Sequence, residues 1–341
     1  MNVVSLVIYN VALLFIMMIP GVLLKKLKMV PEGFGKGLSN LVLYIAQPAL
    51  IFLAYVRDYD AEILKNSAYV FALSIVAHAL FAAVSMLFFK KAPDNRRRML
   101  RFATIFSNAA FMGIPLISAV LEEQFPGATL YASIYNITFN LFLWSLGVYI
   151  CTSKRDVNED GVDDHKEVAS LKKNENDDEK VKDGSGSILK AIYHPVTIAA
   201  LLGLVFFILP INSYIPPIVT NALSMLKNLV APLSMVVIGL RLADMNFRGV
   251  LRDVHMYLFL ALRHIILPLA VVGIIKLLCL CGIEINYVVS MVVVILAATP
   301  AASSATMFAE KFDCDASYVS RLVTISTILS ILTMPLLIML V

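Results

Sequence analysis

Ten apolar runs dominate this chain, and they limit what it can fold into more than any other feature. Each run is long enough for an α-helix to cross the roughly 30 Å of hydrocarbon in a lipid bilayer. Continuous apolar runs favour helices over the shorter, alternating strands of a membrane β-barrel. We therefore predict an all-α integral membrane protein with ten transmembrane helices. The runs lie near residues 3–24, 37–56, 67–89, 99–121 and 129–151, and near 188–209, 217–240, 254–278, 286–309 and 317–340.

Composition supports this class and excludes others. Of the 341 residues, 60% are hydrophobic and 15% charged, and the mean hydropathy is +0.83, far from the balance of soluble domains. The net charge of +4 comes from basic residues beside apolar runs, where they set membrane orientation. We expect no nucleic-acid binding. The cysteines show no zinc-type pairing, so we expect neither a metal site nor a disulfide framework.

Lysine and arginine residues alternate between successive loops. In the first half, loops 25–36 and 90–101 hold 4 and 6 basic residues, whereas loops 57–66 and 122–128 hold 2 and 0. In the second half the order reverses, with 0, 3, 0 and 1 in loops 210–216, 241–253, 280–285 and 310–316. Because basic loops stay on the cytoplasmic side, we predict a multi-pass protein of the cell membrane with both termini outside and a cytoplasmic central loop.

The central segment, residues 152–187, divides the chain into two halves. It is rich in Asp, Glu, Lys, Asn and Gly and has too few large apolar residues to form a core, so we predict a flexible cytoplasmic linker. Residues 1–151 and 188–341 then form two five-helix halves. Five is an odd number of crossings, so the halves insert in opposite senses and predict an inverted repeat. Short matches support it: Leu38-Ser-Asn-Leu-Val42 resembles Leu226-Lys-Asn-Leu-Val230, 188 residues later.

Prolines interrupt the fourth and ninth helices at corresponding positions. Pro115 and Pro300 each lack the N–H that a helix interior needs. Interrupted helices of inverted-repeat transporters place half-helix N-termini at mid-membrane, where partial positive charge and free N–H groups hold an anion. We therefore predict a substrate site at these two interruptions, formed by Asn108, Gly113, Pro115, Pro300, Ser303 and Ser304.

A few ionisable residues lie inside the apolar runs, where charge is costly unless it faces protein or water. Arg263 has two interpretations, neutralising an anionic substrate or serving as a buried hydrogen-bonded strut. His78 and His264 are candidates for a coupling proton because imidazole titrates near neutral pH, or they too are struts. No Asp or Glu lies deep in a predicted span, so a Na⁺ site would need backbone carbonyls and hydroxyls.

Enzyme chemistry finds no support in the sequence. It contains no nucleophile with a partnered base, no phosphate-binding glycine loop and no metal-ligand cluster. We therefore predict that the chain is not an enzyme and uses no cofactor.

At its fourth and ninth helices the sequence resembles the auxin efflux carrier family, which includes plant auxin exporters and bacterial permeases associated with malate or malonate. Asn108-Ala-Ala-Phe-Met-Gly-Ile-Pro-Leu116 is close to the helix-four motif of that family, and Pro300 with Phe308-Ala-Glu-Lys-Phe312 looks like the helix-nine motif. Pro48 and the stretch Pro232 to Gly239 resemble helices two and seven. The resemblance implies a ten-helix inverted repeat with crossed, interrupted helices four and nine, often as a homodimer. It also implies that Asn108 contacts a substrate carboxylate, with Ser107 at the position of a crossover proline.

The sequence thus favours a secondary transporter that moves a small organic anion, such as malate or an auxin-like acid, by alternating access. Two alternatives stay open. One is a Na⁺-coupled symporter of the bile-acid type, and the other is a membrane sensor that binds an organic anion without moving it.

Overall fold

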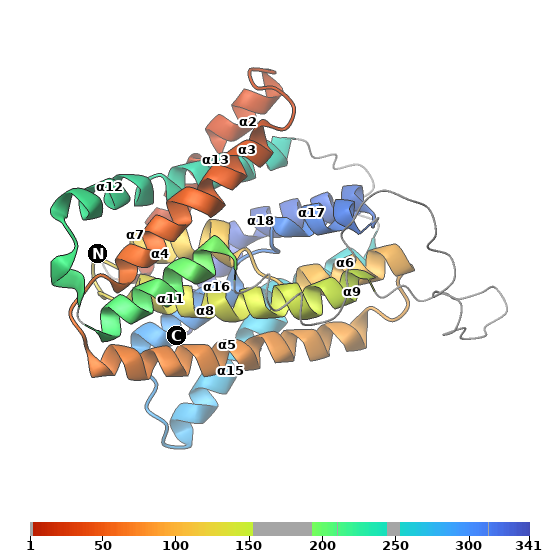
Figure 1. Cartoon of the computed structure of the whole chain (residues 1–341). Helices are drawn as coiled ribbons and strands as arrows, with labels where there is room; N and C mark the ends of the chain where they lie inside the picture. The colour runs from red at the N-terminus through yellow and green to blue at the C-terminus, as the bar shows by residue number, and fades with distance from the viewer. Residues whose placement is uncertain (1–2, 153–192, 210, 244–252, 313) are drawn as a thin grey trace, which may run out of the picture.

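The computed structural model describes residues 3–152, 193–209, 211–243, 253–312 and 314–341 (Figure 1). Regular secondary structure within these ranges is helical, and the all-α prediction is confirmed. Seven helical stretches are long and apolar enough to cross a membrane. Shorter apolar helices cover Ala109–Val120, Pro195–Ile208 and Tyr287–Ala298. The predicted central linker lies outside the described residues, except for Thr152.

The helices of the first half follow the predicted runs closely. Several are joined by short π-helical turns (labelled η), so one predicted span often comprises more than one element. The bounds are α1 Val3–Ile16, α2 Ile19–Lys26, α3 Phe34–Leu41, η1 Val42–Ala46, α4 Gln47–Tyr55, α5 Ala61–Phe88, α6 Asp94–Ile105, η2 Ala109–Gly113, α7 Ile114–Val120, α8 Ala128–Phe142, η3 Leu143–Gly147 and α9 Val148–Thr152.

The second half continues in the same manner after the central segment. Its first described helix begins at Pro195, after a turn at Tyr193 and His194. The predicted start at 188 lies outside the described residues. The bounds are α11 Pro195–Ile208, η4 (a 3₁₀ turn) Ile211–Tyr214, α12 Pro217–Lys227, α13 Val230–Ala243, α14 Val254–Ala261, η6 Leu262–Ile266, α15 Leu267–Leu280, α16 Tyr287–Ala298, α17 Ser304–Lys311 and α18 Ala316–Ile338.

Polar residues fix where several helices begin. The Asp60 carboxylate accepts a hydrogen bond from the Glu62 N–H at 2.7 Å and caps α5. Asp253, Asn286 and Asp315 cap α14, α16 and α18 in the same way. Each side chain satisfies a backbone donor that the first helical turn leaves free.

Three π-helical turns accompany prolines. The turns η1, η2 and η6 each end two residues before a proline, at Pro48, Pro115 and Pro268 respectively. A proline ring crowds the carbonyl four residues earlier and offers it no donor. That carbonyl lies inside the π turn in each case, and the wider winding makes room for the ring.

The helices pack as two groups. We call α2, α3, α4, α11, α12 and α13 the flanking group: α2 and α3 pack on α13, and α4 packs on α11 and α12. We call α5–α8 and α14–α18 the central group, in which α5, α8 and α16 pack on one another and α18 packs on α16. In Figure 1, α2, α3, α12 and α13 lie along one side of the molecule, and α5 and α15 lie on the opposite side.

Glycines allow the closest approaches inside the flanking group. A Cβ built on Gly21 of α2 would lie 2.2 Å from the Val236 carbonyl oxygen of α13. A Cβ on Gly203 of α11 would lie 2.7 Å from the Tyr55 ring of α4. Small residues let helix backbones approach closely, which supplies packing energy where lipid provides no hydrophobic drive between helices.

Candidate functional site

Two helix interruptions meet inside the central group. The helix α6 ends at Ile105 and η2 begins at Ala109, while α16 ends at Ala298 and α17 begins at Ser304. The intervening segments pair in antiparallel fashion through Ser107 and Ala301. Hydrogen bonds flank this pair, from the Asn108 N–H to the Pro300 carbonyl at 2.7 Å and from the Ala302 N–H to the Phe106 carbonyl at 2.9 Å. Each interruption thus satisfies backbone groups that the other leaves free, as the membrane interior requires.

The position of the first interruption differs from the prediction. The sequence placed it at Pro115, but the chain leaves helical geometry at residues 106–108, and Pro115 lies in the first turn of α7. The π turn η2 absorbs the steric effect of Pro115, so this proline does not break the helix. The second interruption contains Pro300, as predicted.

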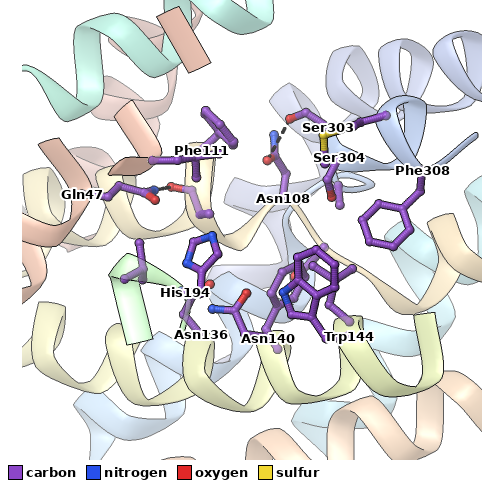
Figure 2. Close-up of a pocket in the computed structure, with 18 residues that line it drawn as sticks. Gln47, Asn108, Phe111, Asn136, Asn140, Trp144, His194, Ser303, Ser304 and Phe308 are labelled. Carbon is purple, nitrogen blue, oxygen red and sulfur yellow. Dashed lines mark hydrogen bonds between the residues drawn. The ribbon is translucent and has the colours of Figure 1, made fainter. Parts of the chain in front are cut away.

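A cavity opens beside this crossing, between the two helix groups (Figure 2). The central group contributes the crossing segments and one face of α8 and η3, and the flanking group contributes α4 and the start of α11. Among the residues that line it in the described chain, none is Asp, Glu, Lys or Arg. The polar lining consists of Gln47, Ser107, Asn108, Asn136, Asn140, Trp144, His194, Ser303 and Ser304.

Hydrogen bonds orient two of these side chains. The Asn108 amide oxygen accepts from the Ser303 hydroxyl at 3.0 Å, which joins the two interruptions through their side chains and leaves the Asn108 NH₂ group free. The Gln47 NH₂ group donates to the Ala110 carbonyl in η2. Figure 2 draws both bonds as dashed lines.

The cavity collects buried polar atoms that have no partner in the described protein. Buried polar groups are almost always hydrogen-bonded, and leaving one unpaired costs about 1–3 kcal/mol. A cluster of them on one cavity therefore makes this cavity the candidate site for a polar ligand. The atoms are Gln47 Oε1, Asn108 Nδ2, Asn136 Oδ1, Trp144 Nε1 and His194 Nδ1.

The structure brings together part of the predicted site. Asn108, Ser303 and Ser304 line the cavity. Pro300 does not line it, but its carbonyl holds the Asn108 backbone. Gly113 serves packing, because a Cβ there would lie 2.5 Å from the Leu296 side chain.

Arg263 lies away from the cavity lining, fully buried. Its guanidinium donates to the carbonyls of Thr104, Ala297 and Thr299, at distances from 2.7 to 3.2 Å. Of the two interpretations that the sequence left open, this geometry favours the hydrogen-bonded strut over direct contact with a substrate.

His78 and His264, the two candidates for a coupling proton, also lie outside the cavity lining. His78 Nδ1 contacts the Ser74 carbonyl at 2.7 Å, and its ring packs among aromatic side chains of α8. His264 Nε2 lies 2.8 Å from the Ser326 hydroxyl, which also accepts from the Ala301 N–H of the crossing at 2.9 Å. His264 therefore supports the second interruption through Ser326.

Sequence reasoning missed Gln47, Asn136, Asn140, Trp144 and His194. A signal existed for three of them, since Asn136, Asn140 and Trp144 follow each other at intervals of four in an apolar run. That spacing puts them on one face of a helix. Gln47 stands beside Pro48 and His194 before Pro195, with no pattern that connects either to helices four and nine.

Helices of spanning length, with paired interruptions that meet inside the bundle, indicate a multi-pass membrane protein. A family model described as membrane transport protein matches residues 6–338. The chain belongs to this family, the auxin efflux carrier family.

Two archaeal proteins that are similar to this chain are both named as uncharacterized transporters. An uncharacterized transporter of Methanothermobacter thermautotrophicus is 25% identical over 328 residues, which cover 94% of each chain. An uncharacterized transporter of Methanocaldococcus jannaschii is 23% identical over 337 residues, which cover 96% of each chain. Both relatives align over nearly their whole length.

Proposed function

We propose that this protein is a secondary carrier for a small carboxylate, such as malate, and that it binds this anion in the cavity at the crossing. The observation that carries the proposal is the set of unpartnered buried polar atoms on a cavity whose described lining contains no carboxylate. The donors among them, the Asn108 amide and the Trp144 indole, suit carboxylate oxygens.

The half-helices add to the attraction of an anion. The N-terminal ends of η2 and of α17 follow the two interruptions, and Asn108, Ser303 and Ser304 at these ends line the cavity. A helix N-terminus carries partial positive charge and free N–H groups, which stabilise a nearby anion. Neutral donors and helix ends together hold a carboxylate without a lysine or arginine, which favours release after transport.

The proposal includes ten transmembrane helices arranged as two inverted five-helix halves. Contacts in the flanking group support this arrangement. The first span of the first half packs on the second span of the second half, through α2 and α13, and the first span of the second half packs on the second span of the first half, through α11 and α4. Both contacts place a glycine of one helix against its partner, Gly21 in one case and Gly203 in the other. The two halves, residues 1–151 and 188–341, are the proposed structural repeats.

The place of the cavity supports alternating access as part of the proposal. Side chains from both helix groups line it, so movement of one group against the other changes which membrane face the cavity meets. We place both termini outside and the central loop in the cytoplasm, as the basic loops predict, and expect the protein to work as a homodimer in the cell membrane.

Uptake of labelled malate into proteoliposomes tests the function. We expect saturable uptake by the native protein and a loss of about 10- to 100-fold in uptake efficiency for Asn108→Ala, since a hydrogen bond to a charged group contributes roughly 1.5–3 kcal/mol. Asn66→Ala is the matched control, because Asn66 is buried in α5 and does not line the cavity. It should retain uptake.

The results of binding and uptake measurements distinguish a carrier from a sensor and from a Na⁺-coupled symporter. If the purified protein binds malate, malonate or indole-acetic acid but moves none of them, it is a sensor and the carrier proposal fails. If uptake strictly requires Na⁺, the bile-acid-type symporter is the better account.

A further inference from the structure

Arg263 carries a positive charge in the interior of the helix bundle without a carboxylate partner. It lies in η6, its exposed fraction is 0%, and no ion pair with Asp or Glu joins it among the described residues. An unpaired buried charge costs several kcal/mol unless nearby groups compensate it. The compensating groups here are backbone carbonyls.

These carbonyls belong to the ends of two helices. Thr104 lies in the last turn of α6, while Ala297 and Thr299 lie at the end of α16. The guanidinium reaches them through Nη1 to Thr104 at 3.1 Å, Nη2 to Ala297 at 3.1 Å, and Nη2 and Nε to Thr299 at 2.7 and 3.2 Å. A helix C-terminus carries about half a negative charge, so two such ends converge on one cation.

Carbonyl oxygens from the ends of interrupted helices are the ligands that membrane transporters offer to Na⁺. In this protein the carbonyls at the ends of α6 and α16 accept hydrogen bonds from the Arg263 guanidinium. The face of Phe81 lies 5.3 Å from the guanidinium carbon and covers it from another side. The group is therefore enclosed and held to the chain by its own side chain.

We propose that Arg263 is a tethered cation that fills a carbonyl cation site at the crossing, in place of a free coupling ion. Arg263 does not line the cavity, so it is a positioning residue: it fixes the C-terminal ends of α6 and α16, and thereby Asn108 and Ser303, which follow them. If the protein is a carrier as proposed, no free cation is needed at this site during transport, and this consequence rests on the proposed function. The carbonyl site itself is independent of that function.

Thermal unfolding of the purified full chain tests the site without any transport measurement. We compare Tm in Na⁺, guanidinium and choline at equal, low millimolar concentration. The native protein should show the same Tm in all three. Arg263→Ala should unfold at lower temperature and regain about 2–4 °C in Na⁺ or guanidinium but not in choline, which is too large, because binding to the folded state stabilises it. Arg263→Met fills the space and should show no recovery.

A second comparison separates charge from hydrogen bonding and does not require the alanine variant to fold. Arg263→Lys keeps the charge and Arg263→Gln keeps donors of similar reach, so the lysine variant should retain the higher Tm. Arg96→Ala, which removes a half-exposed arginine at the start of α6, is the control and should respond to no cation. An Arg263→Ala protein whose Tm ignores every cation, or a glutamine variant as stable as the lysine variant, would overturn the proposal. Neither result depends on whether malate is carried.

Discussion

Trp144 shows how a single side chain can serve the site at the residue scale. Its indole Nε1 is buried beside the cavity and has no partner in the described protein, while its ring packs on Phe308 with centroids 5.8 Å apart. The ring therefore contributes packing and the N–H contributes a donor, and a substitution can separate the two.

We predict that Trp144→Phe raises the KM for the carried anion by about 10-fold or more, because a donor to a charged oxygen is lost while the aromatic packing is kept. Uptake kinetics in proteoliposomes measure KM, and the Tm of the variant serves as the control for folding. An unchanged KM would mean that the indole does not face the substrate.

The residues of the site were only partly predictable from the sequence. Asn108, Ser303 and Ser304 were found because they flank prolines in helices four and nine. Gln47 and His194 were not, because they reach the cavity through the packing of α4 and α11, and a single sequence carries no record of that packing. Arg263 was found as unusual, but its partners are carbonyls, which every residue has.

At the scale of elements, the same limit explains the helix interruptions. Both were expected from proline chemistry, and Pro300 does lie in one. The other begins at Phe106, because pairing with the segment around Ala301 satisfies backbone groups there, and Pro115 is accommodated in a π turn instead. The length of the apolar runs predicted where helices occur, whereas contacts between distant segments decide where they break.

The contact between α2 and α13 gives a prediction at this scale. Gly21→Ala should destabilise the protein by about 1–3 kcal/mol, because its Cβ would meet the Val236 carbonyl and force the two helices apart. Gly273→Ala in α15 is the matched control, since a Cβ there meets nothing within 4 Å, and it should leave Tm unchanged or slightly higher. Thermal unfolding in detergent measures both. Equal Tm values for the two variants would contradict the close approach.

At the scale of the whole molecule, the distribution of basic residues predicts a definite orientation in the membrane. Loop 280–285 holds no basic residue and should face outward, and Cys279 and Cys281 at its start are exposed. A membrane-impermeant maleimide should therefore label this protein in intact cells, and the double substitution Cys279→Ser with Cys281→Ser should abolish the labelling of the protein. Labelling that appears only after permeabilisation would invert the proposed topology.

In the proposed mechanism, the cavity at the crossing is a transport site that opens to each side of the membrane in turn. Ser304 lines this cavity, so Ser304→Cys, in a chain whose four native cysteines are replaced, places a single thiol there. We would measure its labelling by an impermeant maleimide in right-side-out and inside-out vesicles, with and without malate. We expect labelling from both sides, slowed by malate in each case. Labelling from one side only, indifferent to malate, would contradict it.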